Sequence, residues 1–341
     1  MKKDFAIINW WWADDHGAIL TAYALQQFIT ECGYSSELLK CWKNYSEEKR
    51  KQGISNKFSS KYMSISDEEY STYQDLFEKS NNEKIMSKYV AFITGSDQVF
   101  RAERVPDSWF LTFVNGKGKI ALSASFGKND FTCPDSNRYN RIRKSIESFD
   151  FLSVREDEGV SLCKRYFNRE ALWLLDPVFL VDDILYHNLA DTIAINGSDY
   201  IFCYVRDINT NVTSMINRIA DEHKCQPVYC SESMEIEEFL FYIKHSKMII
   251  TDSYHGLCFS IIFNKDFLCI LNVLRGKSRF ESLARQLGLP HKNFVEEKDI
   301  TLINNLKTIN YYPIIQTLNA NRTKDRELLK KVLRDIYKKY V

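Results

Sequence analysis

Residues 247–271 read KMIITDSYHGLCFSIIFNKDFLCIL. Lys247 to Thr251 form a short apolar run rich in β-branched side chains, which is typical of a buried parallel strand. A polar turn follows, after which Leu257 to Phe263 form an apolar helical stretch and Asp266 to Leu271 a second strand. The order strand, turn, helix, strand predicts a parallel α/β unit.

The polar turn Asp252-Ser253-Tyr254-His255-Gly256 lies where parallel α/β folds bind ligands, at the carboxyl end of a strand. The helix behind it presents backbone N–H groups and a partial positive charge at its N-terminus. His255 is suited to move a proton near neutral pH. Two interpretations stand: an anion site beside a catalytic histidine, or a helix capped by Asp252 and Ser253 with His255 in a buried hydrogen bond.

Length and composition indicate a globular protein of two domains. The chain has 341 residues, of which 45% are hydrophobic and 27% charged, and it is too long for one ordinary core. Its formal net charge of +1 argues against nucleic acid as a partner. Nothing in the sequence sets the oligomeric state.

The chain shows no targeting or spanning segment. Its beginning, MKKDFAIINWWW, is typical of a first strand rather than a signal peptide, and no run of about 18 apolar residues occurs. The nine cysteines are scattered without metal-ligand spacing, so we expect reduced thiols and no metal. We expect a cytoplasmic protein, and the many aromatic residues leave peripheral contact with the inner face of the membrane open.

Four apolar strands in the first half end in small or charged residues. The predicted strands are Tyr89–Thr94, Lys119–Ala124, Phe151–Val154 and Leu172–Leu175. Their endings are Gly95-Ser96-Asp97-Gln98, Ser125-Phe126-Gly127, Arg155-Glu156 and Asp176-Pro177. In a parallel sheet such endings line one rim, where ligands bind. No dinucleotide fingerprint and no P-loop motif follows any strand.

Strand and helix patterns alternate on both sides of Asp176-Pro177, so we predict two doubly wound parallel-sheet domains. The first covers residues 1–178 and the second residues 179–311, and a final helix, 312–341, packs back on the first. Phe5 to Trp12 is predicted as the first strand, with its tryptophans alternating along it. Residues 43–86 are rich in Lys, Ser and Glu, and we expect a helical excursion outside the sheet.

Six motifs occur in order along the chain. They are Gly17-Ala18-Ile19-Leu20-Thr21-Ala22-Tyr23-Ala24-Leu25, Gly95-Ser96-Asp97-Gln98-Val99-Phe100, Ser123-Ala124-Ser125-Phe126-Gly127, Ser153-Val154-Arg155-Glu156, Asp176-Pro177-Val178 and Thr251-Asp252-Ser253-Tyr254-His255-Gly256. Together they resemble the polysaccharide pyruvyl transferase family over roughly residues 5 to 290, and the ordered set is specific although each motif alone is weak.

The resemblance implies two Rossmann-like domains that face each other across a cleft, as in the GT-B glycosyltransferases. It also implies transfer of pyruvate from phosphoenolpyruvate onto two hydroxyls of a saccharide. The product would be a cyclic ketal of a surface or capsular polysaccharide, with phosphate released and no other cofactor. The saccharide acceptor could be linked to a lipid or a nucleotide, and the sequence does not choose between them.

Two motifs depart from those of better-studied relatives. This chain has Ser253-Tyr254-His255 where relatives carry Arg-Leu-His, so the histidine is kept and the arginine is not. Arg279 is a candidate to replace that arginine. The first turn reads Asp14-Asp15-His16-Gly17, where relatives often carry Asn-Tyr-Gly.

Ketal formation from an enol phosphate needs an acid, a base, and cationic or N–H donors around the phosphate and carboxylate. We assign His255 as acid/base and Asp97 as base toward a sugar hydroxyl. The candidate donor-binding residues are Arg155, Arg206, Ser253, Gly256, Arg279, Ser125 and Gly127. The candidate acceptor-binding residues are Asp14, His16, Ser96 and Gln98.

Structural alternatives remain open for these residues. Arg155 could form an ion pair with Glu156, Asp97 could cap a helix, and Asp14 and His16 could belong to a solvated turn. Two other functions also remain open. One is a GT-B-like glycosyltransferase that uses a nucleotide-sugar donor, and the other is a non-catalytic glycan-binding member of the family.

Overall fold

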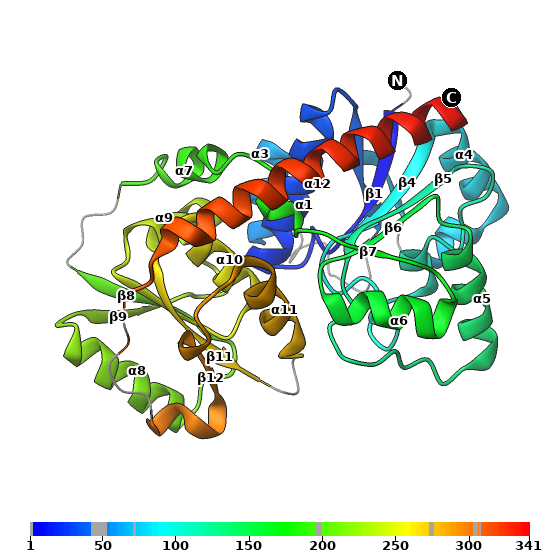
Figure 1. Ribbon diagram of the computed structural model, residues 1–341. Coiled ribbons are helices and arrows are strands. Elements are labelled where there is room, and N and C mark those ends of the chain that lie inside the picture. The colour runs from blue at the N-terminus through cyan, green and yellow to red at the C-terminus, as the bar shows by residue number, and fades with distance from the viewer. Residues whose placement is uncertain are drawn as a thin grey trace. The chain divides into compact units, whose positions relative to one another are not determined.

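The computed structural model describes residues 3–41, 53–70, 73–194, 199–272, 276–302, 306 and 308–341. The chain divides into two compact units, which we call unit 1 (Met1–Val181 and Asn321–Val341) and unit 2 (Asp182–Ala320). Each unit contains its own parallel sheet flanked by helices (Figure 1). The predicted α/β class with two parallel sheets is therefore confirmed.

Within the described part of unit 1, seven strands form one parallel sheet in the order β3-β2-β1-β4-β5-β6-β7. The strands are β1 (Lys3–Ile8), β2 (Ser36–Cys41), β3 (Ile65–Tyr70), β4 (Tyr89–Gly95), β5 (Gly118–Ala124), β6 (Phe151–Val154) and β7 (Leu172–Trp173). The central strands β4 and β5 are buried at every residue, as expected for apolar strands covered on both faces. Their carboxyl ends, and those of β1 and β6, form one rim.

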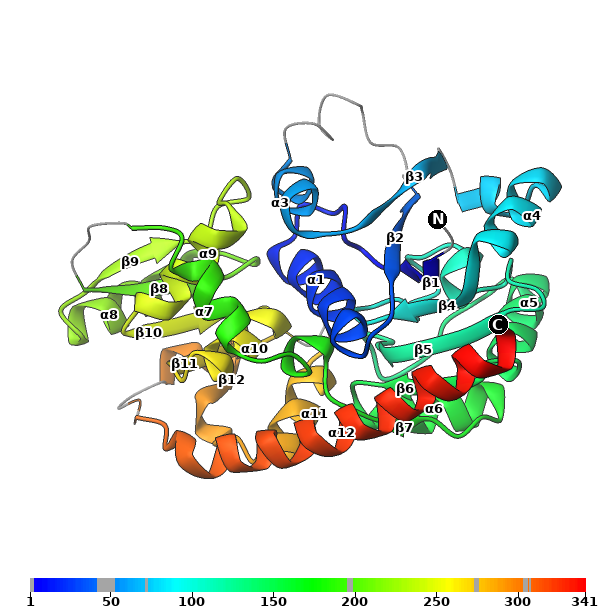
Figure 2. The same ribbon diagram turned by 90° about the horizontal axis from the view of Figure 1, so that it is seen from above.

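Helices of unit 1 connect these strands. They are α1 (His16–Glu31), α3 (Ile54–Tyr62), α4 (Lys79–Lys88), α5 (Ser136–Glu147) and α6 (Asp157–Phe167), with short 3₁₀ turns η1 (Tyr73–Phe77), η2 (Asp107–Phe110) and η3 (Pro177–Phe179). Figure 2 shows α1 beside β2. Asp15 caps α1 by accepting from the Ala18 N–H over 3.0 Å, which satisfies one of the unpaired donors at the helix start.

Two predictions for the first half were wrong in part. Residues 65–70 lie in β3, which pairs in parallel with β2, so the segment 43–86 adds an edge strand to the sheet; residues 43–52 and 71–72 lie outside the described part. The first strand ends at Ile8, and the tryptophans lie in the turn that follows. The Trp11 indole donates to the Leu39 carbonyl over 3.1 Å, and this bond requires the chain to leave the strand.

Unit 2 has five described strands in the order β12-β11-β10-β8-β9, all parallel (Figure 2). They are β8 (Tyr200–Tyr204), β9 (Gln226–Tyr229), β10 (Met248–Thr251), β11 (Asp266–Leu271) and β12 (Phe294–Glu296). The helices are α7 (Ile184–Ala190), α8 (Thr210–Glu222), α9 (Ile236–His245), α10 (Tyr254–Ile262) and α11 (Ser278–Leu287), with 3₁₀ turns η5 (His291–Asn293) and η6 (Glu297–Leu302). The apolar face of α8 packs on β8, β10 and β11 in one core.

The last helix, α12 (Tyr311–Tyr340), contributes its residues from Asn321 onward to unit 1. There the buried Asp325 carboxylate accepts from the Leu175 N–H over 2.8 Å, and Arg322 donates to the Phe179 carbonyl over 2.6 Å. Because both partners lie just after β7, α12 holds the end of the unit 1 sheet.

No helix among the described residues is long and apolar enough to cross a bilayer. Every cysteine whose side chain the structure describes is free of disulfide bonds.

Candidate functional site in two strand rims

The rim of unit 2 is organised by α10, which starts at Tyr254 directly after β10. Tyr254, His255 and Gly256 therefore lie in the first turn of the helix, one turn earlier than the predicted helix start. Ser253 occupies the N-cap position, but its side chain makes no capping hydrogen bond. All nine residues of α10 are buried, so the packed helix holds the His255 backbone rigidly.

The Asp252 carboxylate binds the loop that follows β8. It accepts from the backbone N–H of Arg206 over 2.8 Å and from that of Asp207 over 2.9 Å. The Thr251 hydroxyl donates to the Tyr204 carbonyl over 2.7 Å. These bonds join the loop after β8 to the loop after β10, so the predicted residues Arg206 and Ser253 follow two strands that are fixed to one another.

Gly256 is required by close packing. A Cβ atom at this position would lie 2.2 Å from the Thr251 hydroxyl oxygen and 3.0 Å from the Tyr204 ring. The first turn of α10 is thus pressed against the ends of β8 and β10, and any side chain here would push the helix away.

Two arginines flank this helix start. The Arg279 guanidinium, from α11, lies 5.9 Å from the centre of the Tyr254 ring, and that ring meets the His255 imidazole edge to face with centres 5.3 Å apart. Arg206 is exposed, and its Nη2 donates to the Tyr204 hydroxyl over 3.0 Å. The arginines, the Ser253-Tyr254-His255 triplet and the helix N-terminus thus form one cationic rim within unit 2.

A buried thiol behind this rim, that of Cys269, is influenced by charges of opposite sign. Burial raises the pKa of the Cys269 thiol well above its ordinary value; the nearby Asp252 carboxylate raises it further and Arg279 opposes the rise. Cys269 lies in β11, whose parallel partner is β10. The charges of Asp252 and Arg279 thus have opposite effects on the pKa of this buried thiol.

The rim of unit 1 is centred on Arg155, whose side chain is 1% exposed. Its Nη1 donates to the Asp176 carboxylate over 2.6 Å, and its Nη2 lies 3.2 Å from the Asp97 carboxylate. The Ser96 hydroxyl lies 2.9 Å from the same Asp176 oxygen. The guanidinium is thus enclosed by carboxylates, and it orders the strand ends instead of presenting an exposed cation. Direct contact between Arg155 and a donor stays a prediction.

Glu156 organises the adjacent loop, a role that the sequence did not reveal. Its buried Oε1 accepts from the Ser125 hydroxyl and from the Phe126 N–H, each over 2.8 Å. Gly127 has a φ of +68°, and a Cβ atom there would lie 2.4 Å from the Gln98 side-chain oxygen. Ser125 and Gly127 therefore shape the loop that packs against Gln98.

Asp97 combines an unusual backbone with a partly exposed carboxylate. Its φ is +68°, a conformation that costs energy for a non-glycine residue and concentrates at functional sites. Residues 96–100 form bends and a turn instead of a helix, so the interpretation of Asp97 as a helix N-cap is wrong. Its side chain is 18% exposed while that of its partner Arg155 is buried.

The first turn of the chain serves packing in this structure. Asp14 accepts from the Ser55 N–H over 3.1 Å and from the Ser55 hydroxyl over 2.9 Å, and it thereby holds the start of α3. His16 is buried, being 3% exposed, as the first residue of α1. The expectation of a solvated turn does not hold for His16, and acceptor contact by either residue stays a prediction.

The structure therefore gathers the candidate residues in two groups. Ser96, Asp97, Gln98, Ser125, Gly127 and Arg155 meet on the unit 1 rim, and Arg206, Ser253, His255, Gly256 and Arg279 meet on the unit 2 rim. Besides the role of Glu156, sequence reasoning missed those of Asp176 and Tyr204. Asp176 was visible only as part of an Asp-Pro motif, and Tyr204 was read as an ordinary strand residue.

Comparison with known proteins identifies the family and the fold of the chain. A family model described as polysaccharide pyruvyl transferase matches residues 15–272. No curated protein matches the chain. A UDP-GlcNAc 2-epimerase from Methanocaldococcus jannaschii is similar in structure, with a TM-score of 0.53 and 11% identity over 95% of this chain and 94% of that one.

Two further solved structures are similar. A glycosyltransferase from Rickettsia africae has a TM-score of 0.52 and 12% identity over 97% of this chain and 99% of its own. The wall teichoic acid polymerase TagF has a TM-score of 0.51 and 10% identity over 98% of this chain and 89% of its own. At these identities the likeness concerns the fold, which is that of the GT-B glycosyltransferases and epimerases.

Proposed function

Since this chain belongs to the polysaccharide pyruvyl transferase family, we propose that it transfers the pyruvyl group of phosphoenolpyruvate onto two hydroxyls of a saccharide. The product is a cyclic ketal, and inorganic phosphate is released. The proposal makes unit 2 the donor-binding unit and assigns the acceptor-side residues to unit 1.

The position of Arg279 is the main structural observation that supports this proposal. The sequence resemblance implies an arginine in relatives at the position of Ser253, and phosphoenolpyruvate presents a phosphate and a carboxylate that both favour guanidinium partners. Arg279 comes from a different helix, yet its guanidinium lies beside Tyr254, the residue next to position 253. These contacts support Arg279 of α11 and Arg206 at the end of β8 as the cations that would meet the donor.

The proposed reaction consists of proton transfers, two attacks by sugar hydroxyls and the loss of phosphate. The methylene carbon of the donor gains a proton and becomes a methyl group, which leaves positive charge on its C2. One sugar hydroxyl attacks C2 and loses its proton, and the bond from C2 to the phosphate oxygen breaks. The second hydroxyl then attacks C2, loses its proton and closes the ring. His255 is the proposed acid, because an imidazole exchanges protons readily near neutral pH.

Asp97 is the proposed base on the acceptor side. One of its carboxylate oxygens is anchored by Arg155, while the side chain still reaches solvent. An anchored carboxylate has a defined direction, which a general base needs. The proposal treats Arg155 as the residue that positions Asp97.

Ligand-induced stabilisation tests the donor. The unfolding temperature is measured with phosphoenolpyruvate and, separately, with nucleotides and nucleotide sugars, since a ligand that binds only the folded state raises it. We expect stabilisation by phosphoenolpyruvate that is lost in Arg279→Gln and kept in Arg218→Gln, a variant of a half-exposed arginine on α8. Stabilisation by a nucleotide sugar alone would instead support the glycosyltransferase alternative.

A further inference from the structure

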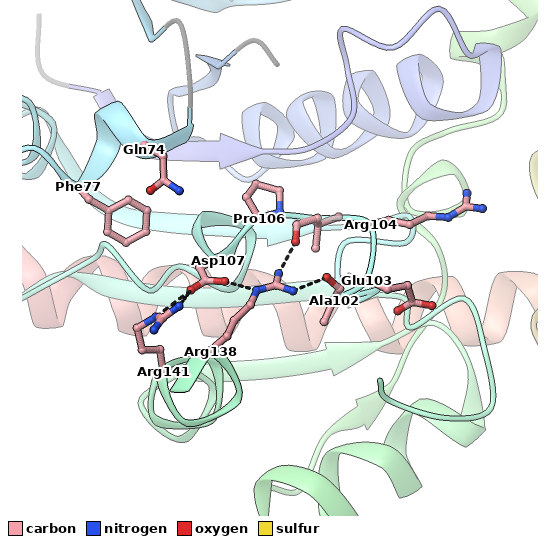
Figure 3. Close-up of a pocket in the computed structure, with 10 residues that line it drawn as sticks. Gln74, Phe77, Ala102, Glu103, Arg104, Pro106, Asp107, Arg138 and Arg141 are labelled. Carbon is pink, nitrogen blue, oxygen red and sulfur yellow. Dashed lines mark hydrogen bonds and ion pairs between the residues drawn. The ribbon is translucent and has the colours of Figure 1, made fainter. Parts of the chain in front are cut away.

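Unit 1 contains a pocket of about 650 Å³, a size typical of small-molecule sites. Its walls come from η1, from the loop after β4, and from the first two turns of α5 (Figure 3). The lining residues that matter to its chemistry are Gln74, Phe77, Glu103, Asp107, Arg138 and Arg141.

Arg138 builds one wall of the pocket. Its Nε donates to the Asp107 carboxylate over 2.6 Å, and its two Nη atoms donate to the carbonyls of Ala102 and Val105 over 2.7 and 2.5 Å (Figure 3). Its side chain is 22% exposed. With three bonds to the loop and η2, this arginine fixes the pocket shape.

Arg141 is more exposed to solvent than Arg138. Its Nε and Nη2 both contact the Asp107 carboxylate, over 3.0 and 2.9 Å, and its side chain remains 56% exposed. Asp107 therefore orients the Arg141 guanidinium without enclosing it. An oriented and solvent-accessible guanidinium loses little side-chain entropy when it binds a carboxylate or a phosphate.

The charges of the lining favour an anion. Glu103 is already matched by Lys128 at 2.5 Å and by Arg101 at 3.1 Å, and Asp107 is matched by Arg138 and Arg141. The two lining carboxylates are thus each held by two cations, and the lining arginines outnumber them. An entering anion meets a positive field that is not cancelled by an unpaired carboxylate.

An aromatic ring and an amide complete the pocket. Phe77 is 41% exposed, and the Phe113 ring holds it edge to face with centres 6.0 Å apart. An exposed ring that is held in one orientation can stack on the apolar C–H face of a pyranose. Gln74 is exposed on the same 3₁₀ turn, and its amide offers both a donor and acceptors for hydroxyl groups.

The pocket is joined to the candidate acceptor residues. Arg101 donates to the Glu103 carboxylate over 3.1 Å and to the Gln98 side-chain oxygen over 2.8 Å. One arginine therefore links a pocket wall to Gln98, which follows Asp97 on the unit 1 rim. A saccharide whose reacting hydroxyls lie at Asp97 would extend toward this pocket.

We propose that the pocket binds an anionic pyranose of the saccharide acceptor, with Arg141 contacting its carboxylate or phosphate and Phe77 covering its ring. That the ligand is the acceptor rests on the proposed function; that the pocket takes an anionic sugar rests on its own residues.

Calorimetric titration of the full chain tests the site. The probes are glucose 1-phosphate, glucuronic acid, methyl glucoside and inorganic phosphate, each to about 20 mM, a range that resolves millimolar binding. We expect one or both anionic sugars to bind at least about tenfold more tightly than methyl glucoside, and the two probes show whether phosphate or carboxylate is preferred. Binding of inorganic phosphate as tight as that of either sugar would contradict the saccharide part of the proposal.

Variants locate the binding. Arg141→Gln should weaken the anionic sugar at least about tenfold, and Phe77→Ala should weaken it while leaving the phosphate affinity unchanged. Arg143→Gln is the matched control, because Arg143 lies on the same helix and pairs with Glu147. Undiminished binding in a folded Arg141→Gln variant, or no sugar binding to the unaltered protein, would overturn the proposal.

The same variants separate this proposal from the donor assignment. Arg141→Gln should keep the stabilisation by phosphoenolpyruvate. If phosphoenolpyruvate does not stabilise the protein but an anionic sugar binds through Arg141, the proposed donor is refuted and the proposed sugar pocket is supported. The converse result would refute the pocket alone.

Discussion

The Nη1 atom of Arg155 lies 2.6 Å from the Asp176 carboxylate, and the two side chains are 1% and 0% exposed. The same guanidinium contacts Asp97 at 3.2 Å and lies 3.9 Å from Glu156. Buried charges of this kind are tolerated only when each is paired with an opposite charge, because an unpaired buried charge has a large desolvation cost.

We predict that Arg155→Ala lowers the free energy of unfolding by about 3–5 kcal/mol, because it leaves Asp176 and its neighbours as uncompensated buried carboxylates. Urea unfolding measures this change. Arg143→Ala removes an exposed pair with Glu147 and should change stability by less than about 0.5 kcal/mol. A stable Arg155→Ala variant would show that the guanidinium does not hold the rim together.

His255→Ala should reduce kcat by about 10²- to 10⁴-fold while the melting temperature changes little, if His255 is the acid. The measurement is phosphate release from phosphoenolpyruvate in the presence of a saccharide acceptor. His245→Ala, at an exposed position on α9, provides the control. A variant that loses about 1–3 kcal/mol of stability, with activity reduced only by lost folded material, would assign His255 a structural role.

Arg279→Ala should weaken phosphoenolpyruvate binding by about 10- to 100-fold, which corresponds to a charge-assisted hydrogen bond of about 1.5–3 kcal/mol. Arg279→Lys should recover only part of the affinity, since an ammonium group cannot form the bidentate contact. Equilibrium titration of the variants measures both effects. Equal affinity in all three proteins would remove Arg279 from the donor site.

Lys119 gives the stability a specific pH dependence. Burial lowers the pKa of this lysine to about 8, below its ordinary value near 10.5. Between these two values the unfolded chain binds more protons than the folded one, so this group makes stability rise with pH. Its ammonium donates to the hydroxyls of Ser145 over 3.2 Å and Ser148 over 3.1 Å, and the Asp150 carboxylate opposes the lowering of its pKa.

Lys119→Met should remove this contribution. The difference in unfolding free energy, unaltered protein minus variant, should increase as the pH is raised from about 8 to about 10. Comparing the two proteins at each pH cancels the titration of tyrosines and cysteines that both share. Lys144→Met, at an exposed position on α5, is the control and should show no such trend. A constant difference across this range for Lys119→Met would disprove the effect.

The parallel sheets and the membership of each rim could be predicted from the sequence to a large extent. Strands such as Phe151–Val154 and Asp266–Leu271 were predicted with the bounds that the structure shows, because a buried parallel strand needs a continuous apolar run. The rule that carboxyl ends share one rim then grouped Asp97 with Arg155 and Arg206 with His255 before any contact was known.

The edge strand β3 escaped prediction for a physical reason. Its sequence, ISDEEY, is polar and charged, and only pairing with β2 makes it a strand. The start of α10 was also missed, because Tyr254 and His255 look like turn residues until the helix packs on Thr251. Local sequence patterns do not show these tertiary partners, β2 and Thr251.

The sequence by itself determined which residues end each strand and therefore which chemical groups are available. Tertiary contacts set the surroundings of those groups: Arg155 is enclosed by carboxylates, Asp252 binds the backbone after β8, and Arg279 lies beside the Tyr254 ring. The physical reason is that a charged side chain acts through the partners and the solvent around it. Those are set by contacts between segments far apart in the chain, and no local pattern records them.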